Sequence, residues 1–345
     1  MNLKELSLKL GLSPTTVSRA LNGYPEVNEA TRDRVLVAAK RFDYRPNSRA
    51  IRLASGRSMA VGHVFPVAIK NEIMNPIFAD FIAGAGEVYA PNGYDLLLSV
   101  VADDQEEAAY RELKSRGAVD GVIIHALRTD DPRIGILTSL GIPFVCHGRA
   151  TDVTQDYSWV DVNNRRAFLR ATDFLLDLGH ERIALVNGTE RMDFATRRRS
   201  GFFDAQIARG ITPNEAFVSA GSMTEFSGYE AASRMLEADN PPTAFLASSM
   251  LSGMGVRRAL EGRGLKLGRD VSVIIFDDEL SYLRNGEDLP IFTATRSSVR
   301  DAGRIAAQML LDLITGAAPG PQHRLLEADL IIGQTTGPVL RHTQI

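Results

Sequence analysis

The chain has 345 residues, of which 44% are hydrophobic and 23% charged, and this length and composition favour a soluble protein of two or three folding units. No apolar run approaches the ~20 residues that span a bilayer, and the opening MNLKELSLKLG lacks the apolar segment of a secretory signal, which argues against a membrane protein and against export. The single cysteine, Cys146, is consistent with a reducing cytoplasm.

Charge is distributed unevenly along the chain. The net charge is −3 overall, but residues 1–57 contain eleven Lys and Arg against five Asp and Glu, which gives this segment +6. The other 288 residues therefore carry 28 minus 37, or −9. A basic segment on an acidic body favours a polyanionic partner for that segment alone.

The amino-terminal segment predicts three short helices. A leucine stripe over residues 3–10 indicates the first helix, which Gly11 would end. Ser13 suits an N-cap and the proline after it suits the first helical position, so a second helix is predicted over residues 14–21. A third helix, capped by an asparagine, is predicted over residues 29–42, with Phe42 among its buried side chains.

The second helix has an unusually polar outer face. Val17 and Leu21 point inward, which leaves small hydroxyls and one arginine outside. A helix, a tight turn, a helix and a bracing third helix form the helix-turn-helix arrangement, whose second helix enters the DNA major groove. A small solvated three-helix cap is the alternative interpretation.

From Met59 onward, apolar strands alternate with amphipathic helices. Strand candidates include MAVGHVF, DLLLSVV, GVIIHAL, IPFVCHG, RIALVNG, TAFLASS and VSVIIFD, and helix candidates occupy 106–116, 165–178, 228–238 and 250–262. This alternation predicts parallel sheets with helices on both faces. About nine strands in this region favour two doubly wound lobes over one sheet, with a ligand cleft at the carboxyl ends of the strands.

Dense motifs then identify a family resemblance. TVSRALN, TRDRVLVAA and YRPN, followed by a segment ending in Arg52-Leu53-Ala54, closely resemble the head of LacI/GalR-family transcription regulators. The remainder is similar to that family's sugar-binding core, which is periplasmic-binding-protein-like, and DGVII, GIPFV, VDVNN, LGHERIALV and VSVIIFDD occur in the expected order. The resemblance covers essentially the whole chain and implies an all-α helix-turn-helix head on an α/β two-lobe core.

The resemblance also implies domain boundaries. It places the DNA-binding domain at residues 1–46, a hinge helix and linker at 47–57, and an effector-binding and dimerisation domain at 58–345. Within that domain it implies an N-lobe at about 58–160 and 292–325 and a C-lobe at about 161–291 and 326–345.

Nine DNA-binding residues follow from the resemblance. It implies base reading by Pro14 and Thr15 and guanine recognition by Arg19, which can grip guanine O6 and N7 together. Proline offers only apolar contact, so the preferred operator should differ from that of relatives with a polar residue there. The other positions are Thr16, Ser18 and Asn22, implied to contact phosphate, and the hinge residues Asn47, Ala50 and Leu53, of which Leu53 would wedge into a minor-groove base step. Helix capping and solvation remain the alternative for the hydroxyls.

Eight effector-binding residues are implied in the same way. In this interpretation Arg198 is a donor fork and Asp277 accepts hydrogen bonds from vicinal hydroxyls, while Asp278 supports the loop. Core packing accounts equally well for Phe78, and loop bracing for His147. The full set is Phe78, His147, Arg149, Arg198, Met223, Ser248, Asp277 and Arg296. Trp159, the only tryptophan, is expected in the crossover or core.

Other function classes fit less well. An enzyme could use Asp277 and Asp278 or Cys146 with His147, but adjacent strand carboxylates point in opposite directions and a mid-strand thiol is inert. No phosphate loop, nucleophile elbow or metal-ligand spacing occurs, so no cofactor, metal or catalytic residue is predicted. A transporter's solute-binding protein would explain the core but neither the basic head nor the lack of an export signal.

The sequence therefore predicts a cytoplasmic regulator that binds double-stranded operator DNA. We expect a repressor of carbohydrate-utilisation genes, controlled by a small carbohydrate-like effector, with an activator or a corepressor-dependent regulator as the alternative. The segment GQTTGPVLRHTQI near the end contains no leucine heptads, so a homodimer is expected in preference to a tetramer.

Overall fold

The structure is a computed structural model that describes residues 1–21, 23–42, 44, 56–66, 76–102 and 105–339. The contacts between residues divide the chain into two compact units, which we call the head, Met1–Met59, and the core, Ala60–Ile345. No helix among the described residues combines the length and the apolarity needed to cross a bilayer.

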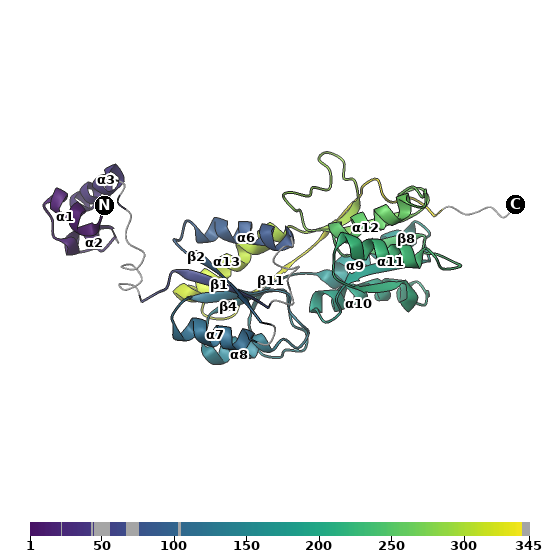
Figure 1. The fold of residues 1–345 in the computed structure, drawn as a ribbon, viewed down its shortest axis with the longest axis horizontal. Helices are drawn as coiled ribbons and strands as arrows, with labels where there is room; N and C mark the ends of the chain where they lie inside the picture. Colours follow the sequence, from purple (N-terminus) through teal and green to yellow (C-terminus); the bar gives the residue numbers. More distant parts are fainter. Residues whose placement is uncertain (22, 43, 45–55, 67–75, 103–104, 340–345) are drawn as a thin grey trace. The chain divides into compact units, whose positions relative to one another are not determined.

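The head contains α1 (Leu3–Leu10), α2 (Pro14–Leu21) and α3 (Glu29–Arg41) (Figure 1). The predicted helix boundaries are confirmed to within a residue because their capping residues act as expected. Gly11 ends α1 in the left-handed conformation, at φ 63°. The Ser13 hydroxyl accepts a hydrogen bond from the backbone N–H of Thr16 at 3.1 Å, and Asn28 caps α3 in the same way.

Small and branched side chains fill the centre of the head. Its buried apolar residues are Leu6, Val17, Ala20, Val27, Val35, Ala38 and Ala39. The prediction that Phe42 is buried is wrong, because α3 ends at the preceding residue and the ring stays at the surface. There the ammonium of Lys9 lies 4.5 Å from the Phe42 ring centroid, a cation–π contact with α1.

The core consists of two lobes, each built on a six-stranded sheet. The N-lobe sheet has the order β11-β5-β4-β3-β1-β2, made of β1 (Ala60–Pro66), β2 (Asp95–Val101), β3 (Gly121–Ile124), β4 (Phe144–His147), β5 (Ser158–Val162) and β11 (His323–Leu326). The C-lobe sheet has the order β12-β10-β9-β8-β6-β7, made of β6 (Ile183–Gly188), β7 (Val218–Gly221), β8 (Ala244–Ala247), β9 (Ser272–Asp277), β10 (Thr293–Arg296) and β12 (Asp329–Ile331). The pairings are parallel except that of β10 with β12.

Helices cover both faces of each sheet, which confirms the doubly wound architecture (Figure 1). In the N-lobe, one face is covered by α6 (Pro76–Tyr89) and α13 (Val299–Thr315), and the other by α7 (Glu106–Ser115) and α8 (Pro132–Leu140). In the C-lobe, α9 (Asn164–Asp177) and α10 (Asp193–Ala208) pack opposite α11 (Glu225–Met235) and α12 (Met250–Glu261), and a short 3-10 turn, Glu215–Phe217, precedes β7. The four predicted helix ranges correspond to α7, α9, α11 and α12.

Glycines let the two helices that cover one face of the N-lobe sheet approach closely. A Cβ added at Gly84 in α6 would lie 2.0 Å from the Arg300 carbonyl oxygen, and one at Gly303 in α13 would lie 2.1 Å from the Phe81 carbonyl oxygen. Only glycine fits at both contacts. This packing places the start of α6 beside the cleft.

The chain crosses between the lobes after β5, after β10 and between β11 and β12. The predicted boundary near residue 292 is therefore too early, because β10 pairs with β9 over Thr293–Arg296 and belongs to the C-lobe sheet. Its short TATR sequence gives little strand signal by itself. The crossing to the N-lobe comes at residues 297–298, just before α13 begins.

Candidate functional site

A cavity of about 390 Å³ lies between the two lobes, a size typical of small-molecule sites. Residues at the carboxyl ends of several strands line it, among them Phe65 in β1, His147 in β4, Ser248 after β8 and Asp278 after β9. The strand order reverses between β1 and β3 in the N-lobe sheet and between β6 and β8 in the C-lobe sheet, and doubly wound sheets bind ligands at the carboxyl ends of the strands beside such a point.

The N-lobe wall is aromatic. The rings of Phe65 and Phe78 meet edge to face with centroids 4.6 Å apart, and those of Phe81 and His147 lie 4.5 Å apart. His125, at the end of β3, completes the wall. Phe78 thus both packs against a core ring and faces the cavity. Aromatic rings that line a cavity offer an apolar surface to the carbon–hydrogen face of a sugar.

Arg198 is the most constrained polar side chain of the C-lobe wall. It is only 6% exposed, and it donates hydrogen bonds to Asn164 Oδ1 and to the Ser248 carbonyl oxygen, each at 2.7 Å. The guanidinium carbon lies 4.0 Å from the centroid of the Phe276 ring. Burial lowers the pKa of Arg198 to about 10, so the group stays cationic at neutral pH.

Of the two aspartates at the end of β9, Asp278 lines the cavity and Asp277 does not. Asp278 lines the cavity, and burial raises its pKa to about 7, although the nearby charge of Arg198 acts in the opposite direction. Asp277 accepts hydrogen bonds from Arg296 Nε and from the Glu279 backbone N–H, both at 3.0 Å. The predicted roles of Asp277 and Arg296 in the wall are thus corrected, because the two side chains pair with each other outside it.

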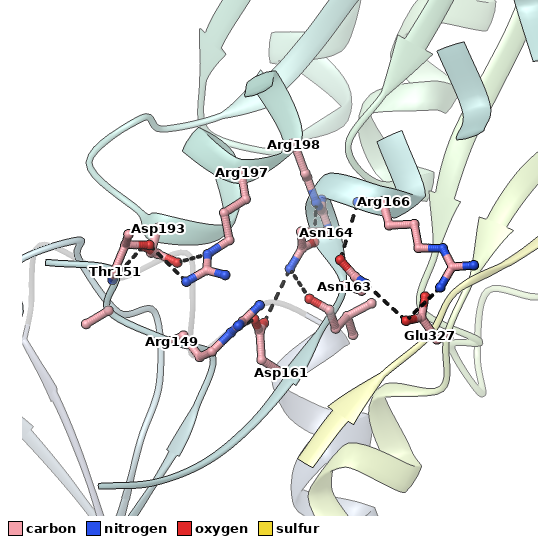
Figure 2. A network of polar contacts seen from close by, with 12 residues as sticks. Arg149, Thr151, Asp161, Asn163, Asn164, Arg166, Asp193, Arg197, Arg198 and Glu327 are labelled. Carbon is pink, nitrogen blue, oxygen red and sulfur yellow. Dashed lines mark hydrogen bonds and ion pairs between the residues drawn. The ribbon is translucent and has the colours of Figure 1, made fainter. Parts of the chain in front are cut away.

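A chain of polar contacts between residues that line the cavity joins the two lobes (Figure 2). From Arg198 it continues through Asn164, whose amide donates to Asp161 Oδ1 at 3.3 Å. Arg149 Nε donates to Asp161 Oδ2 at 2.7 Å and so completes the chain. Burial raises the pKa of Asp161, and the Arg149 charge opposes this shift. Asn164 and Asp161 are functional candidates that the sequence-based prediction missed, although VDVNN contains both.

Two further contacts join the lobes at the rim of the cavity. We call Thr151, Asp193 and Arg197 the rim clasp (Figure 2). The Asp193 carboxylate accepts hydrogen bonds from the hydroxyl of Thr151 and from the backbone N–H of Thr151, the latter at 2.9 Å. It also accepts a hydrogen bond from Arg197 Nε. On α6, Asp80 accepts hydrogen bonds from the backbone and the hydroxyl of Ser281. These contacts hold the lobes together with the cavity between them.

The remaining predicted wall residues are in place. Met223 and Ser248 line the cavity, and the Ser248 hydroxyl donates to Asn187 at 2.9 Å. Trp159 does not line it. Its ring stacks against His323 and lies 4.8 Å from the Arg149 guanidinium, as expected for a residue near the crossover.

The predicted DNA-contacting face lies on α2. Pro14, Thr15 and Arg19 are exposed there, whereas Thr16 and Ser18 are half-buried. The Thr16 hydroxyl is 2.8 Å from that of Ser13, so it takes part in the helix cap. The predictions for Asn22, Asn47, Ala50 and Leu53 lie outside the described residues.

Two other arginines of the head support its turns. Arg32 donates to the carbonyl oxygens of Gly23, Tyr24 and Val27, and Arg34 donates to that of Leu10 at 2.7 Å. These guanidinium groups satisfy carbonyls at the turns between helices, whereas Arg19 extends from α2.

Comparisons with known proteins agree with this geometry. A family profile described as bacterial regulatory proteins, lacI family, matches residues 2–47, and one for a periplasmic binding protein-like domain matches residues 172–336. The HTH-type transcriptional regulator AglR of Rhizobium meliloti is 44% identical over 98% of this chain and 95% of its own length. RafR of Escherichia coli is 34% identical, over 92% of this chain and 94% of its own.

Solved structures show the same fold. A complex of the transcriptional regulator CelR with cellobiose has a TM-score of 0.72 at 29% identity and covers 97% of this chain and 99% of its own. A lac repressor dimer bound to operator and the anti-inducer ONPF has a TM-score of 0.80 at 23% identity, over 98% of this chain and 99% of its own. With its helix-turn-helix head and two-lobed core, the chain belongs to the LacI family of DNA-binding transcription regulators.

Proposed function

We propose that the chain represses carbohydrate-utilisation genes and leaves its operator when an uncharged carbohydrate fills the cavity between the lobes. The cavity itself is the observation that supports this function, because it combines an aromatic wall with the buried Arg198 and the half-buried Asp278. Donor and acceptor side chains facing an aromatic surface suit a sugar ring, and the related CelR structure holds cellobiose.

The charges of the cavity wall indicate an uncharged effector. Its charged lining residues among those described are Arg149, Arg198, Asp161 and Asp278, which sum to zero when both carboxylates are ionised. Arg149 is already paired with Asp161. A phosphorylated or acidic sugar would require cationic side chains without such partners. Calorimetry with cellobiose, maltose, sucrose and melibiose against glucose 6-phosphate tests this class, and preferential binding of the phosphate ester would contradict it.

We propose that α2 reads the operator through Pro14, Thr15 and Arg19, and that Thr16, Ser18, Asn22 and the hinge residues Asn47, Ala50 and Leu53 complete the interface. Replacement of Arg19 by alanine should weaken binding to an operator selected from random DNA by about tenfold to a hundredfold, because a bidentate guanine contact is lost. Gel-shift titration against operator and random DNA measures this effect.

Lys40→Ala serves as the matched control for Arg19→Ala. Lys40 is an exposed cation of α3, so its loss removes the same charge from the head. It should reduce affinity for operator and random DNA alike, through fewer phosphate contacts. If the two variants lose the same affinity on both DNAs, Arg19 does not read bases.

We also propose a homodimer that uses the edge strand β2. Along this strand Leu97 and Val101 pack into the N-lobe core, whereas Leu96, Leu98 and Val100 remain 41%, 44% and 55% exposed on the other face. Exposed apolar stripes mark interaction surfaces, and two-fold dimers suit the paired half-sites of helix-turn-helix proteins. The related lac repressor structure is a dimer.

Leu98→Arg should raise the dimer dissociation constant at least about tenfold, because the charge would lose its water in the interface. Sedimentation equilibrium measures the constant. Leu325→Arg is the control, since Leu325 is an equally exposed leucine on β11 at the opposite edge of the same sheet. An unchanged dimer for Leu98→Arg, or equal dissociation of both variants, would place the interface elsewhere.

We assign residues 1–46 to DNA binding, 47–57 to the hinge and 58–345 to the two lobes, with the crossings placed after β5, after β10 and after β11.

We propose that the cavity binds its effector without transforming it: Cys146 is buried in β4, which raises its pKa well above normal, and Asp277 is paired with Arg296. Because the target is chromosomal DNA, we place the protein in the cytoplasm.

A further inference from the structure

Three histidines form a continuous row from the interior of the N-lobe to the cavity wall. His63 lies in β1, His125 follows β3 and His147 ends β4, and these three strands are neighbours in the sheet. His63 Nδ1 is 2.9 Å from His125 Nε2, and His125 Nδ1 is 3.4 Å from His147 Nδ1. His125 and His147 line the cavity, whereas His63 is fully buried behind them.

The three rings are neutral, and their tautomers depend on one another. Burial lowers the pKa of His63 to about 3 and that of His147 to about 4, and it also holds the pKa of His125 well below its usual value. A neutral imidazole has one N–H and one bare nitrogen. Each of the two contacts needs one N–H and one bare nitrogen, so only two proton arrangements satisfy both. Moving one proton therefore requires moving all three.

The buried end of the row distinguishes these two arrangements. His63 Nε2 is buried and has no hydrogen-bond partner among the described residues. An unpaired buried N–H is rarer in proteins than an under-satisfied acceptor, so this nitrogen is the bare one. The His63 proton is then on Nδ1 and is donated to His125 Nε2. His125 in turn donates from Nδ1 to His147 Nδ1, and the His147 proton is on Nε2.

The geometry points to His63 as a positioning residue for effector recognition: without touching the cavity, it makes His147 present an N–H donor that selects an acceptor oxygen of the effector. The effector part of this inference rests on the proposed function. The row does not converge on a common point, and no group of three or more His, Cys, Asp or Glu side chains in the described part of the chain could hold a metal ion. Proton placement is therefore the property to test.

Nitrogen-15 NMR of the full-length, unliganded protein tests the proton placement directly. Two-bond proton–nitrogen correlations distinguish a protonated ring nitrogen from a bare one, and single-histidine variants assign the six histidines of the chain. We expect N–H at Nδ1 of His63, at Nδ1 of His125 and at Nε2 of His147. The reverse pattern, or mixed tautomers at His147, would overturn the inference. This measurement needs no effector, so it stands even if no carbohydrate binds.

Two nearly isosteric variants test the consequence for binding. In His63→Asn the amide can still donate to His125 Nε2, whereas an ionised carboxylate in His63→Asp only accepts and should reverse the row. The two variants are compared at about pH 9, because burial raises the pKa of a carboxyl group. With the tightest-binding disaccharide of the four named above, His63→Asn should stay within about threefold of wild type. His63→Asp should bind at least about tenfold more weakly, as expected for one lost hydrogen bond.

Val64→Ala controls for lost packing, because Val64 is the next buried residue of β1 and does not line the cavity. It should lower stability and leave the disaccharide affinity unchanged. A reversed NMR pattern in His63→Asp together with undiminished binding would show that His147 does not recognise the effector. Equal losses in His63→Asn and His63→Asp would show that His63 acts through packing alone.

Discussion

We expect Arg198→Ala to weaken effector binding at least about a hundredfold while the protein still binds its operator. Loss of hydrogen bonds from a charged donor costs about 3 kcal/mol, which corresponds to roughly this factor. The change would leave Asn164 Oδ1 and the Ser248 carbonyl without their donor and Asp278 without its counter-charge. Isothermal titration calorimetry with the best-binding disaccharide measures the loss, and gel shifts measure operator release.

Two variants sharpen this test. Arg198→Lys keeps the charge but cannot donate to both acceptors with one rigid fork, so it should bind nearly as weakly as Arg198→Ala. Arg199→Ala changes the next residue of α10, which pairs with Glu190 and Glu215 and does not line the cavity, so its effector affinity should equal that of wild type. Normal disaccharide binding by Arg198→Ala would rule out the proposed site.

The second large effect concerns the rim clasp. Asp193→Ala should destabilise the closed arrangement of the lobes by about 2 kcal/mol, because the Thr151 hydroxyl and backbone N–H of the other lobe lose their charged acceptor. Apparent affinity scales with the population of the binding-competent state, so effector binding should weaken at least about tenfold even though Asp193 does not line the cavity. Small-angle scattering of the unliganded protein should report more open lobes.

Asp204→Ala is the control for Asp193→Ala. Asp204 also lies on α10, but its partner is Arg165 in the same lobe and the pair is largely exposed. Such a pair contributes little, so scattering and binding should match wild type. Closed lobes and full affinity in Asp193→Ala would mean that the other contacts between the lobes, among them Asp80 with Ser281 and Asn164 with Asp161, suffice to hold them together.

Local signals in the sequence were sufficient to predict the head and the layered core. Ser13, Asn28 and Gly11 act within one turn of their own positions, so the helix boundaries follow from neighbouring residues alone. The prediction that Phe42 is buried was wrong because the burial of a side chain also depends on where its helix ends. The short strand β10 was assigned to the wrong lobe because its partners are distant in sequence: a loop separates it from β9, and α13 and β11 lie between it and β12.

The site was harder to predict than the fold. Choosing between Asp277 and Asp278 requires knowing which residue is the last to pair in β9, since the next side chain turns toward the other side. Sequence alone does not show that Asp277 is already bound by Arg296. His125 had a usable signal, because it directly follows the apolar strand GVII at the ligand-binding end of the sheet.

The repeated crossing between lobes affects how the protein is made. The N-lobe needs α13 and β11, and the C-lobe needs β10 and β12, so neither can be completed until the ribosome has synthesised nearly the whole chain. The head, by contrast, has its own small core and emerges first. During each round of translation there is therefore an interval in which a nascent polypeptide already has its DNA-reading module but cannot yet sense a metabolite.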